Sequence, residues 1–276
     1  MLTIFTIPKA FQGHIETIQC NAINSWRRLV PQCEIMLCGN DPGVAEAALK
    51  YGVAHVPDIA CNEYGTPLLS SAFAVVQKMA RYPLVCYVNA DIIFLSDIIT
   101  AVKRIKQPRF LMIGQRWDID IPTSIVFQES RWESNLRKRV VAEGSLHPPA
   151  GSDYFIFPTG TLGKLPDFAV GRAGWDNWVI YRARSLKVPV IDATQANMII
   201  HQEHSYGHVP QKTGQKWEGP ETMHNLKLMQ GHDKYYTLLD ATHVLTAKSL
   251  RPAWEYKYVR RRLVRAKQYL TKLFRK

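Results

Sequence analysis

The sequence has no run of about 18 uninterrupted apolar residues, so it contains no readable transmembrane helix. Its 276 residues include only five cysteines, an odd number without a C-x-x-C pair. Cysteines in this pattern favour reduced thiols in a cytosolic protein over a disulfide framework or a cysteine zinc site. The first residues also lack the basic segment of a secretory signal peptide. Together these absences predict a cytoplasmic protein.

Two glycine-rich nucleotide fingerprints are missing as well. No G-x-G-x-x-G follows the first strand pattern, and no G-x-x-x-x-G-K-[ST] occurs anywhere in the sequence. We therefore do not expect a dinucleotide oxidoreductase or a P-loop NTPase. Binding of a nucleotide sugar, which needs no glycine fingerprint, stays compatible with the sequence.

Acidic residues are absent from the C-terminal segment 257–276. Most of the net charge of +12 is therefore located in this segment and not in the rest of the chain. The segment holds nine Lys or Arg, which leaves 26 basic and 23 acidic residues, a net charge of +3, for the rest of the chain. A basic nucleic-acid-binding protein is an alternative, but it would be expected to carry positive charge over its body. We therefore predict no nucleic-acid partner.

Strand patterns alternate with helix patterns along the first half of the chain. Apolar runs predict strands, and segments with helical spacing predict helices between them; the strands are at 2–7, 34–38, 53–56 and 84–88, and the helices at 14–29, 44–51 and 68–80. This alternation predicts an α/β fold with a mixed, mainly parallel sheet flanked by helices. Residues 201–235 show little periodicity, which predicts an ordered active-site loop or a partly mobile lid.

The segment 84–95 is central to the functional prediction. A buried apolar strand ends in Asn89-Ala-Asp91, and a second apolar run follows at once. A carboxylate between two apolar runs needs a partner, because burying an unpaired charge is costly. Ligands bind at the carboxyl ends of strands in α/β sheets, and one or two carboxylates plus substrate phosphates commonly hold Mg²⁺. Asp91, with Asn89 beside it, is therefore a candidate metal ligand; the alternative is a strand-end turn.

Other strand-end segments supply candidate nucleotide contacts. If the strands are parallel, the loops at Pro8-Lys9 and at 62–66 open on the same sheet edge as the candidate metal ligand. Lys9 could contact phosphate, and Asn62 and Thr66 could hydrogen-bond the base or the ribose. The alternative for each loop is ordinary turn chemistry.

Two further carboxylates lie at predicted element boundaries. Asp176 stands between Trp175 and Trp178 at the start of a predicted helix, where the flat aromatic faces suit a sugar ring. Its alternative role is to cap the helix N-terminus. Asp153, at the head of an apolar strand, is a second candidate for binding the acceptor or the donor sugar, with a turn as its alternative.

Three histidines and a glutamate fall within eight residues after a short apolar run. They form the segment His201-Gln-Glu-His204-Ser-Tyr-Gly-His208, and neutral histidine is a common metal ligand. His204 is the first candidate ligand, His201 the second and His208 the third. A zinc site made by the three histidines alone and a polar loop without metal are the alternatives, and the spacing differs from H-E-x-x-H.

Taken in order, these segments resemble the GT-A-fold glycosyltransferases, in particular the bacterial nucleotide-diphospho-sugar transferase group. The resemblance rests on T-I-P-K, N-E-Y-G-T-P, Y-V-N-A-D-I, G-R-x-x-W-D-N-W and H-Q-x-H. Asn89 stands in place of the first Asp of the Asp-x-Asp signature. The resemblance implies a GT-A (Rossmann-like) domain over 1–245, with a nucleotide-binding half at 1–95 and an acceptor and metal-completing half at 96–245. A tail, 246–276, follows.

By this resemblance the protein is a metal-dependent glycosyltransferase that moves a sugar from a nucleotide-diphosphate sugar to a glycan or lipid-linked acceptor, in cell-surface polysaccharide or glycolipid synthesis. Mn²⁺ or Mg²⁺ would bind Asp91 with His204 or His201. Asp176 would be the general base if the reaction inverts configuration, whereas Asp176 or Asp153 would orient substrates if it retains configuration. The implied nucleotide-sugar contacts are Pro8, Lys9, Asn62, Gly65, Thr66, Asn89, Arg116 and Trp175. A binding module with this fold and little catalysis is the alternative, because Asn89 replaces an acidic ligand.

The tail has the composition of a basic amphipathic helix. Val259, Leu263, Ala266 and Leu270 form an apolar stripe at helical spacing, with Lys and Arg residues around it. Such a helix is attracted to anionic lipid, which predicts a peripheral position on the inner face of the cell membrane. The alternatives are a solvated helix packed on its own domain and a nucleic-acid contact.

Overall fold

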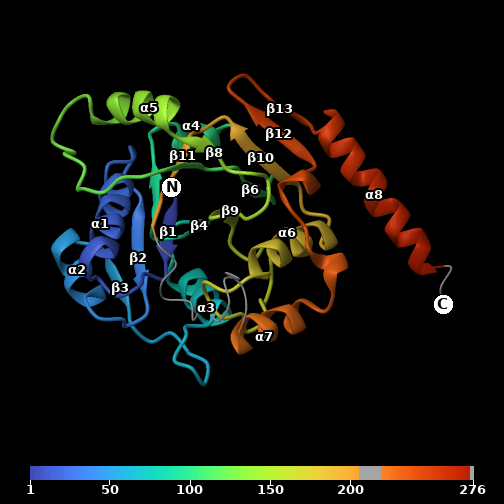
Figure 1. The fold of residues 1–276 in the computed structure, drawn as a ribbon, viewed down its shortest axis with the longest axis horizontal. Helices are drawn as coiled ribbons and strands as arrows, with labels where there is room; N and C mark the ends of the chain where they lie inside the picture. The colour runs from blue at the N-terminus through green and yellow to red at the C-terminus, as the bar shows by residue number, and fades with distance from the viewer. Residues whose placement is uncertain (205–218, 274–276) are drawn as a thin grey trace.

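A mixed nine-stranded β-sheet runs through the middle of the protein, and helices cover both of its faces (Figure 1). The computed structural model describes residues 1–204 and 219–273. The strand order is β13-β12-β10-β6-β9-β4-β1-β2-β3. In chain order these strands are β1 (Thr3–Thr6), β2 (Glu34–Cys38), β3 (Ala54–Val56), β4 (Leu84–Val88), β6 (Leu111–Ile113), β9 (Tyr154–Pro158), β10 (Val190–Gln195), β12 (His243–Thr246) and β13 (Leu250–Pro252).

Most neighbouring strands of this sheet are parallel. β1 is parallel to β2 and β4, β2 is parallel to β3, and β10 is parallel to β6 and β12. β9 is antiparallel to β4 and β6, and β13 is antiparallel to β12. The predicted α/β fold with a mixed, mainly parallel sheet is thereby confirmed.

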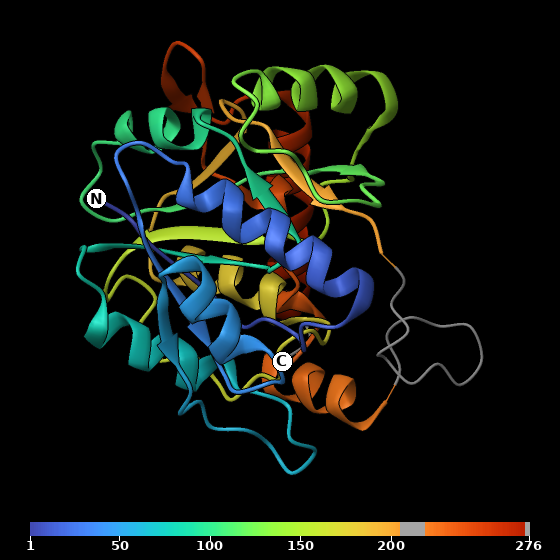
Figure 2. The same ribbon diagram turned by 90° about the vertical axis from the view of Figure 1, so that its left-hand side faces the viewer.

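The core lies in two layers, one on each face of the large sheet. Alternate strand side chains point to opposite faces. Phe5 accordingly packs in one layer with Phe73 and Trp178, whereas Ile4 packs in the other layer with Trp26. The helices are α1 (Gly13–Arg27), α2 (Val44–Tyr51), α3 (Leu69–Met79), α4 (Asp97–Lys103), α5 (Trp132–Glu143), α6 (Trp175–Ser185), α7 (Pro220–Met229) and α8 (Tyr256–Leu273), with short 3-10 helices η1 (His232–Lys234) and η2 (Leu238–Asp240). Figure 2 shows α1 and α2 side by side.

A second, four-stranded sheet lies against the first. Its order is β5-β11-β7-β8, with strands β5 (Ile92–Phe94), β11 (Ile199–Gln202), β7 (Trp117–Ile119) and β8 (Ser145–Leu146). β11 is antiparallel to β5 and parallel to β7. Leu136 and Val140 of α5 cover this sheet by packing on Ile119 and Ile200. The small sheet therefore joins three segments that are distant in the sequence.

The prediction of a loop or lid over 201–235 is wrong for residues 220–229, which form α7. The helix begins with Pro220 at its first position, a place where proline is favoured. Its buried side chains include Thr222 and Asn225, and Asn225 exchanges two hydrogen bonds of 3.0 Å with the backbone of Ala169. Because this inner face is partly polar, the sequence shows no apolar period of 3.6.

The C-terminal segment is partly integrated into the domain. β13 continues the large sheet past residue 245, and α8 then leads away from the body (Figure 1). Tyr258 is buried and donates a hydrogen bond to Asp192, while Arg261 and Arg265 both bind the carboxylate of Asp240. Within the part of the chain that the structure describes, no helix is long and apolar enough to cross a membrane.

Candidate active site

A cavity of about 640 Å³ lies beside the ends of β1 and β4, where the two sheets meet. This volume is in the range of small-molecule and cofactor sites. The cavity is lined by polar side chains that the sequence singles out and by several that it does not: Lys9, Asn89, Asp91, Arg116, His147, Asp153, Arg172, Asp176, His201 and His204, with Trp175 and Tyr235 among the aromatic residues.

The register of the small sheet brings three of these side chains together. His201 of β11 pairs with Ile92 of β5 on one side and with Asp118 of β7 on the other. Asp91 precedes Ile92 directly, so the same pairing places it next to His201. The buried Gln202 fixes the backbone here, since its side-chain amide donates to the carbonyl oxygen of Asp91 at 3.1 Å.

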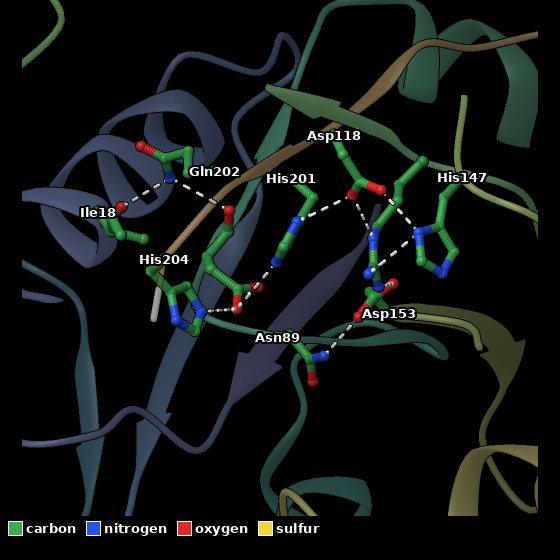
Figure 3. A network of polar contacts seen from close by, with 10 residues as sticks. Ile18, Asn89, Asp118, His147, Asp153, His201, Gln202 and His204 are labelled. Atoms are coloured by element: carbon green, nitrogen blue, oxygen red, sulfur yellow. Dashed lines mark hydrogen bonds and ion pairs between the residues drawn. The ribbon is translucent and has the colours of Figure 1, made fainter. Parts of the chain in front are cut away.

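Asp91, His201 and His204 form a cluster of candidate metal ligands. Figure 3 labels the two histidines. Asp91 Oδ2 lies 3.1 Å from His204 Nε2 and 3.7 Å from His201 Nε2, and the three ligand atoms are within 4.8 Å of one another. Asp91 Oδ1 is buried and accepts no hydrogen bond from any described residue. A buried carboxylate oxygen of this kind needs a partner. One carboxylate with two imidazoles therefore fits a divalent cation.

The electrostatics of this cluster are strongly coupled. Burial favours the neutral form of Asp91, but hydrogen bonds from His201 and His204 outweigh it and hold the pKa of Asp91 well below its usual range. Burial would also lower the pKa of His201, yet Asp118 and Asp91 raise the pKa of His201 to about 9. The cluster thus holds positive charge beside Asp91, as a bound cation would.

The pairing of β4 with β9 brings together a second polar cluster next to the candidate metal ligands, made by Asn89, Asp153 and Arg116. Val88 is opposite Tyr154, so the next residue pair is Asn89 and Asp153. Asn89 donates from its backbone N–H to the carbonyl oxygen of Asp153 at 2.9 Å and from its side-chain amide to Asp153 Oδ1 at 2.8 Å. Asp153 Oδ2 pairs with Arg116. Both oxygens of Asp153 are therefore already occupied.

Asp176, unlike Asp153, has no charged partner among the described residues. It lies in the first turn of α6, after Gly174, whose φ of +97° is a conformation that glycine adopts without strain. Asp176 is thus not the N-cap residue of the helix, and it forms no ion pair with any described residue. The pKa of Asp176 is raised to about 6, chiefly by burial. Backbone N–H groups lower it, and the nearby charge of Asp153 acts with burial to raise it.

Lys9 and Arg172 bring positive charge to the cavity wall. The backbone N–H and carbonyl of Lys9 are fixed by the side chain of Gln19, at 2.7 and 2.9 Å. Burial lowers the pKa of Lys9, although Asp91 partly counteracts this. Arg172 makes hydrogen bonds of 3.0 and 2.6 Å to Glu221 at the start of α7.

The loop at 62–66 does not line this cavity. Asn62 Oδ1 accepts the backbone N–H groups of Tyr64 and Thr66, at 3.0 Å each, and the Asn62 amide donates to Glu221 at 2.8 Å. Gly65, with φ +78°, completes the turn. Among the predicted nucleotide-sugar contacts, Lys9, Asn89, Arg116 and Trp175 line the cavity, whereas Asn62, Gly65, Thr66 and Pro8 do not.

The two tryptophans beside Asp176 have different surroundings. Trp175 lines the cavity and packs edge-on against Tyr87, with 5.1 Å between the ring centroids. Trp178 packs in the core against Phe168 and is absent from the cavity wall. Only one of them can therefore face a ligand in this cavity.

Sequence reasoning missed Asp118 and His147, which belong to the same network. Asp118 accepts hydrogen bonds from Arg116 Nε at 2.8 Å and His147 Nδ1 at 2.6 Å. Asp118 lies in the three-residue strand β7, and Arg116 directly precedes that strand. A strand of this length gives too short an alternation in the sequence to be informative. The third candidate histidine, His208, lies outside the described residues.

Neither a protein-family model nor a curated protein sequence matches the chain, but solved structures do. The mannosyltransferase PcManGT from Pyrobaculum calidifontis, in complex with GDP-Man and Mn²⁺, has a TM-score of 0.44 and 11% identity over 75% of this chain and 58% of that chain. Glucosyl-3-phosphoglycerate synthase from Mycobacterium tuberculosis, in complex with Mn²⁺, UDP and glucosyl-3-phosphoglycerate, has a TM-score of 0.47 and 14% identity over 75% of this chain and 74% of that chain.

TarS 1–349 from S. aureus, in complex with UDP-GlcNAc, has a TM-score of 0.49 and 12% identity over 83% of this chain and 65% of that chain. The match thus spans less than two thirds of the mannosyltransferase and of TarS 1–349. These likenesses concern the fold alone.

Proposed function

We propose that the protein is a metal-dependent glycosyltransferase that moves a sugar from a nucleotide-diphosphate sugar to a glycan or lipid-linked acceptor. One observation carries the proposal: the Asp91, His201 and His204 cluster shares a cavity with Asp176, a carboxylate with a pKa of about 6. A cation site and a proton acceptor in one cavity suit an inverting, metal-dependent transfer to a hydroxyl group. The product would enter cell-surface polysaccharide or glycolipid synthesis.

The cavity residues divide into donor-binding and acceptor-activating groups. Asp91, His201 and His204 would hold Mn²⁺ or Mg²⁺, which would offset the negative charge that develops on the leaving diphosphate. Lys9 and Arg172 line the cavity and would bind phosphate oxygens, and Trp175, which also lines it, would pack against the sugar. Asn62, Gly65 and Thr66 would act indirectly, because Asn62 holds Glu221 and Glu221 holds Arg172.

Asp176 is the proposed general base of an inverting reaction. Its pKa of about 6 keeps it ionised at neutral pH and makes it a stronger base than an ordinary carboxylate. Asp153 is unsuited to that role, because Arg116 and Asn89 already occupy its oxygens. We assign Asp153 to orienting a substrate.

We expect one nucleoside diphosphate to stabilise the protein against unfolding, and only when Mn²⁺ is present. A ligand at a hundredfold excess over its Kd adds about 2.7 kcal/mol to the free energy of unfolding. The measurement is thermal unfolding with UDP, GDP, CDP and ADP in turn, with and without Mn²⁺. Absence of stabilisation by all four would contradict the proposal. Metal-dependent binding without transfer to glycan or lipid-linked acceptors would favour a binding module instead.

The outer face of α8 supports a further part of the proposal, attachment to an anionic membrane surface at the inner face of the cell membrane. Tyr256, Leu263 and Leu270 repeat at heptad spacing and are 78%, 67% and 52% exposed, opposite the face that holds Arg261 and Arg265. Exposed Arg260 and Lys267 flank this stripe. Each basic side chain near an anionic surface contributes about 1 kcal/mol.

The protein should sediment with vesicles of anionic phospholipid and not with vesicles of neutral phospholipid, and high salt should release it. A double variant, Leu263→Ser with Leu270→Ser, should bind about tenfold more weakly, because it removes apolar side chains from the interface. Leu49→Ser removes an exposed leucine from α2 and should bind as the wild type does. Equal sedimentation with both kinds of vesicle, or unchanged binding of the double variant, would contradict this assignment.

A further inference from the structure

Asp118 receives three hydrogen-bond donors on one carboxylate (Figure 3). His201 Nδ1 lies 3.0 Å from Oδ1, Arg116 Nε lies 2.8 Å from Oδ1, and His147 Nδ1 lies 2.6 Å from Oδ2. Asp118 also forms an ion pair with Arg116, and the guanidinium group favours the ionised carboxylate. Asp118 is therefore an acceptor only, and each neighbouring ring must direct an N–H toward it.

This arrangement fixes which nitrogen of His201 faces the cation site. With the proton on Nδ1 directed at Asp118, a neutral His201 carries its lone pair on Nε2, the atom 3.7 Å from Asp91 Oδ2. The contact also has little freedom, because His201 and Asp118 are paired residues of β11 and β7. A slip of one residue would turn His201 to the other face of the sheet.

We infer that Asp118 is a positioning residue, which sets the tautomer and the ring orientation of His201 for binding a divalent cation. The inference rests on the metal site of the proposed function. A histidine ligand that donates its other N–H to a carboxylate is held in one orientation and becomes a better ligand. Asp118 is not one of the three candidate ligands, so its role is exerted through His201.

The test is the affinity of the metal-free full-length protein for Mn²⁺ alone, measured by calorimetry. Asp118→Asn should bind Mn²⁺ about 10- to 100-fold more weakly than the wild type. The matched control is Asp120→Asn, which removes the same charge from an exposed position two residues away and should leave the affinity within about twofold. Asp118→Glu, which keeps an ionised acceptor, should recover part of the loss. Unchanged affinity in Asp118→Asn would overturn the inference.

A second measurement does not depend on the folding of a variant. In the wild type with bound Zn²⁺, nitrogen NMR of labelled histidines should show His201 protonated at Nδ1 and coordinated through Nε2. A proton on Nε2 of His201 would overturn the inference.

The failure of this inference is distinguishable from the failure of the metal site itself. If the wild type does not bind Mn²⁺, or if Asp91→Asn binds it equally well, the site is wrong and the positioning role falls with it. If Asp91→Asn loses binding while Asp118→Asn keeps it, only the positioning role is wrong.

Discussion

Asp91→Asn should lower kcat/KM for transfer by at least about a thousandfold, because cation catalysis is worth several kcal/mol and each 1.36 kcal/mol is a factor of ten. Asparagine has nearly the same shape, but it is neutral and cannot supply the carboxylate of the cluster. The variant should also lose the Mn²⁺-dependent part of the nucleotide stabilisation. The measurement is kcat/KM at a series of Mn²⁺ concentrations.

The control for this variant is Asp58→Asn, which removes a carboxylate from an exposed position outside the cavity wall. It should keep wild-type turnover and wild-type metal dependence. If Asp91→Asn itself turned over fully and still needed the metal, the cation would have to bind elsewhere, and the proposed site would be wrong.

Asp176→Asn should lower kcat by about 10²- to 10⁴-fold, which is the usual contribution of a general base. In the wild type, kcat should fall as the pH drops through about 6, because protonated Asp176 cannot accept the proton of the acceptor hydroxyl. The measurement is the pH dependence of kcat for the two proteins. A wild-type rate that is flat between pH about 5 and 8 would contradict the role of base.

Asp176→Asn should have a larger free energy of unfolding than the wild type at high pH. The folded pKa of Asp176, about 6, is above its ordinary value of 3.8, so folding favours the protonated form. Stability is therefore lost as the pH rises from about 4 to about 6 and does not return above that range. Asparagine carries no charge, so Asp176→Asn should gain roughly 1–3 kcal/mol at about pH 8 and little at about pH 4.

The stability of Asp153→Asn should be compared with that of Asp176→Asn, because both substitutions remove a carboxylate from the same cavity. The carboxylate of Asp153 is one of two that pair with the largely buried Arg116, the other being Asp118, so its removal should destabilise the protein. Opposite signs for the two variants, measured by denaturant unfolding, are expected. A loss of stability in both would mean that Asp176 is a structural group.

The sequence predicts the large sheet and the position of Asp91 just after a buried strand, because both depend on local patterns. The run 84–88 is apolar on both faces and ends directly at Asn89, so its burial and its polar end are visible in a few residues. The small sheet has no such signal. Its strands are two to four residues long, and His201 and Asp118 are 83 residues apart in the sequence. The network around Asp118 depends on this register and could not be predicted.

The loop at 62–66 shows that a strand-end loop reaches the cavity only if its strand also lies close to the cavity in the sheet order. Strand-end reasoning places the loops after β1 and β3 equally near the site. In the sheet, however, β1 is next to β4, whereas β3 is at the edge, three strands from β4. That separation is roughly 14 Å at the usual spacing between strands. Lys9 therefore reaches the cavity, whereas Asn62 is connected to it through Glu221 and Arg172.

The attachment of α8 to Asp240 has a consequence for how the chain could evolve. Asp240 is buried, and its carboxylate is neutralised by Arg261 and Arg265, which both come from the C-terminal helix. A mutation that ended translation before α8 would leave that charge unpaired, and breaking a buried ion pair costs about 3–5 kcal/mol. Natural selection on folding alone would thus retain the helix, whether or not its outer face has a role of its own.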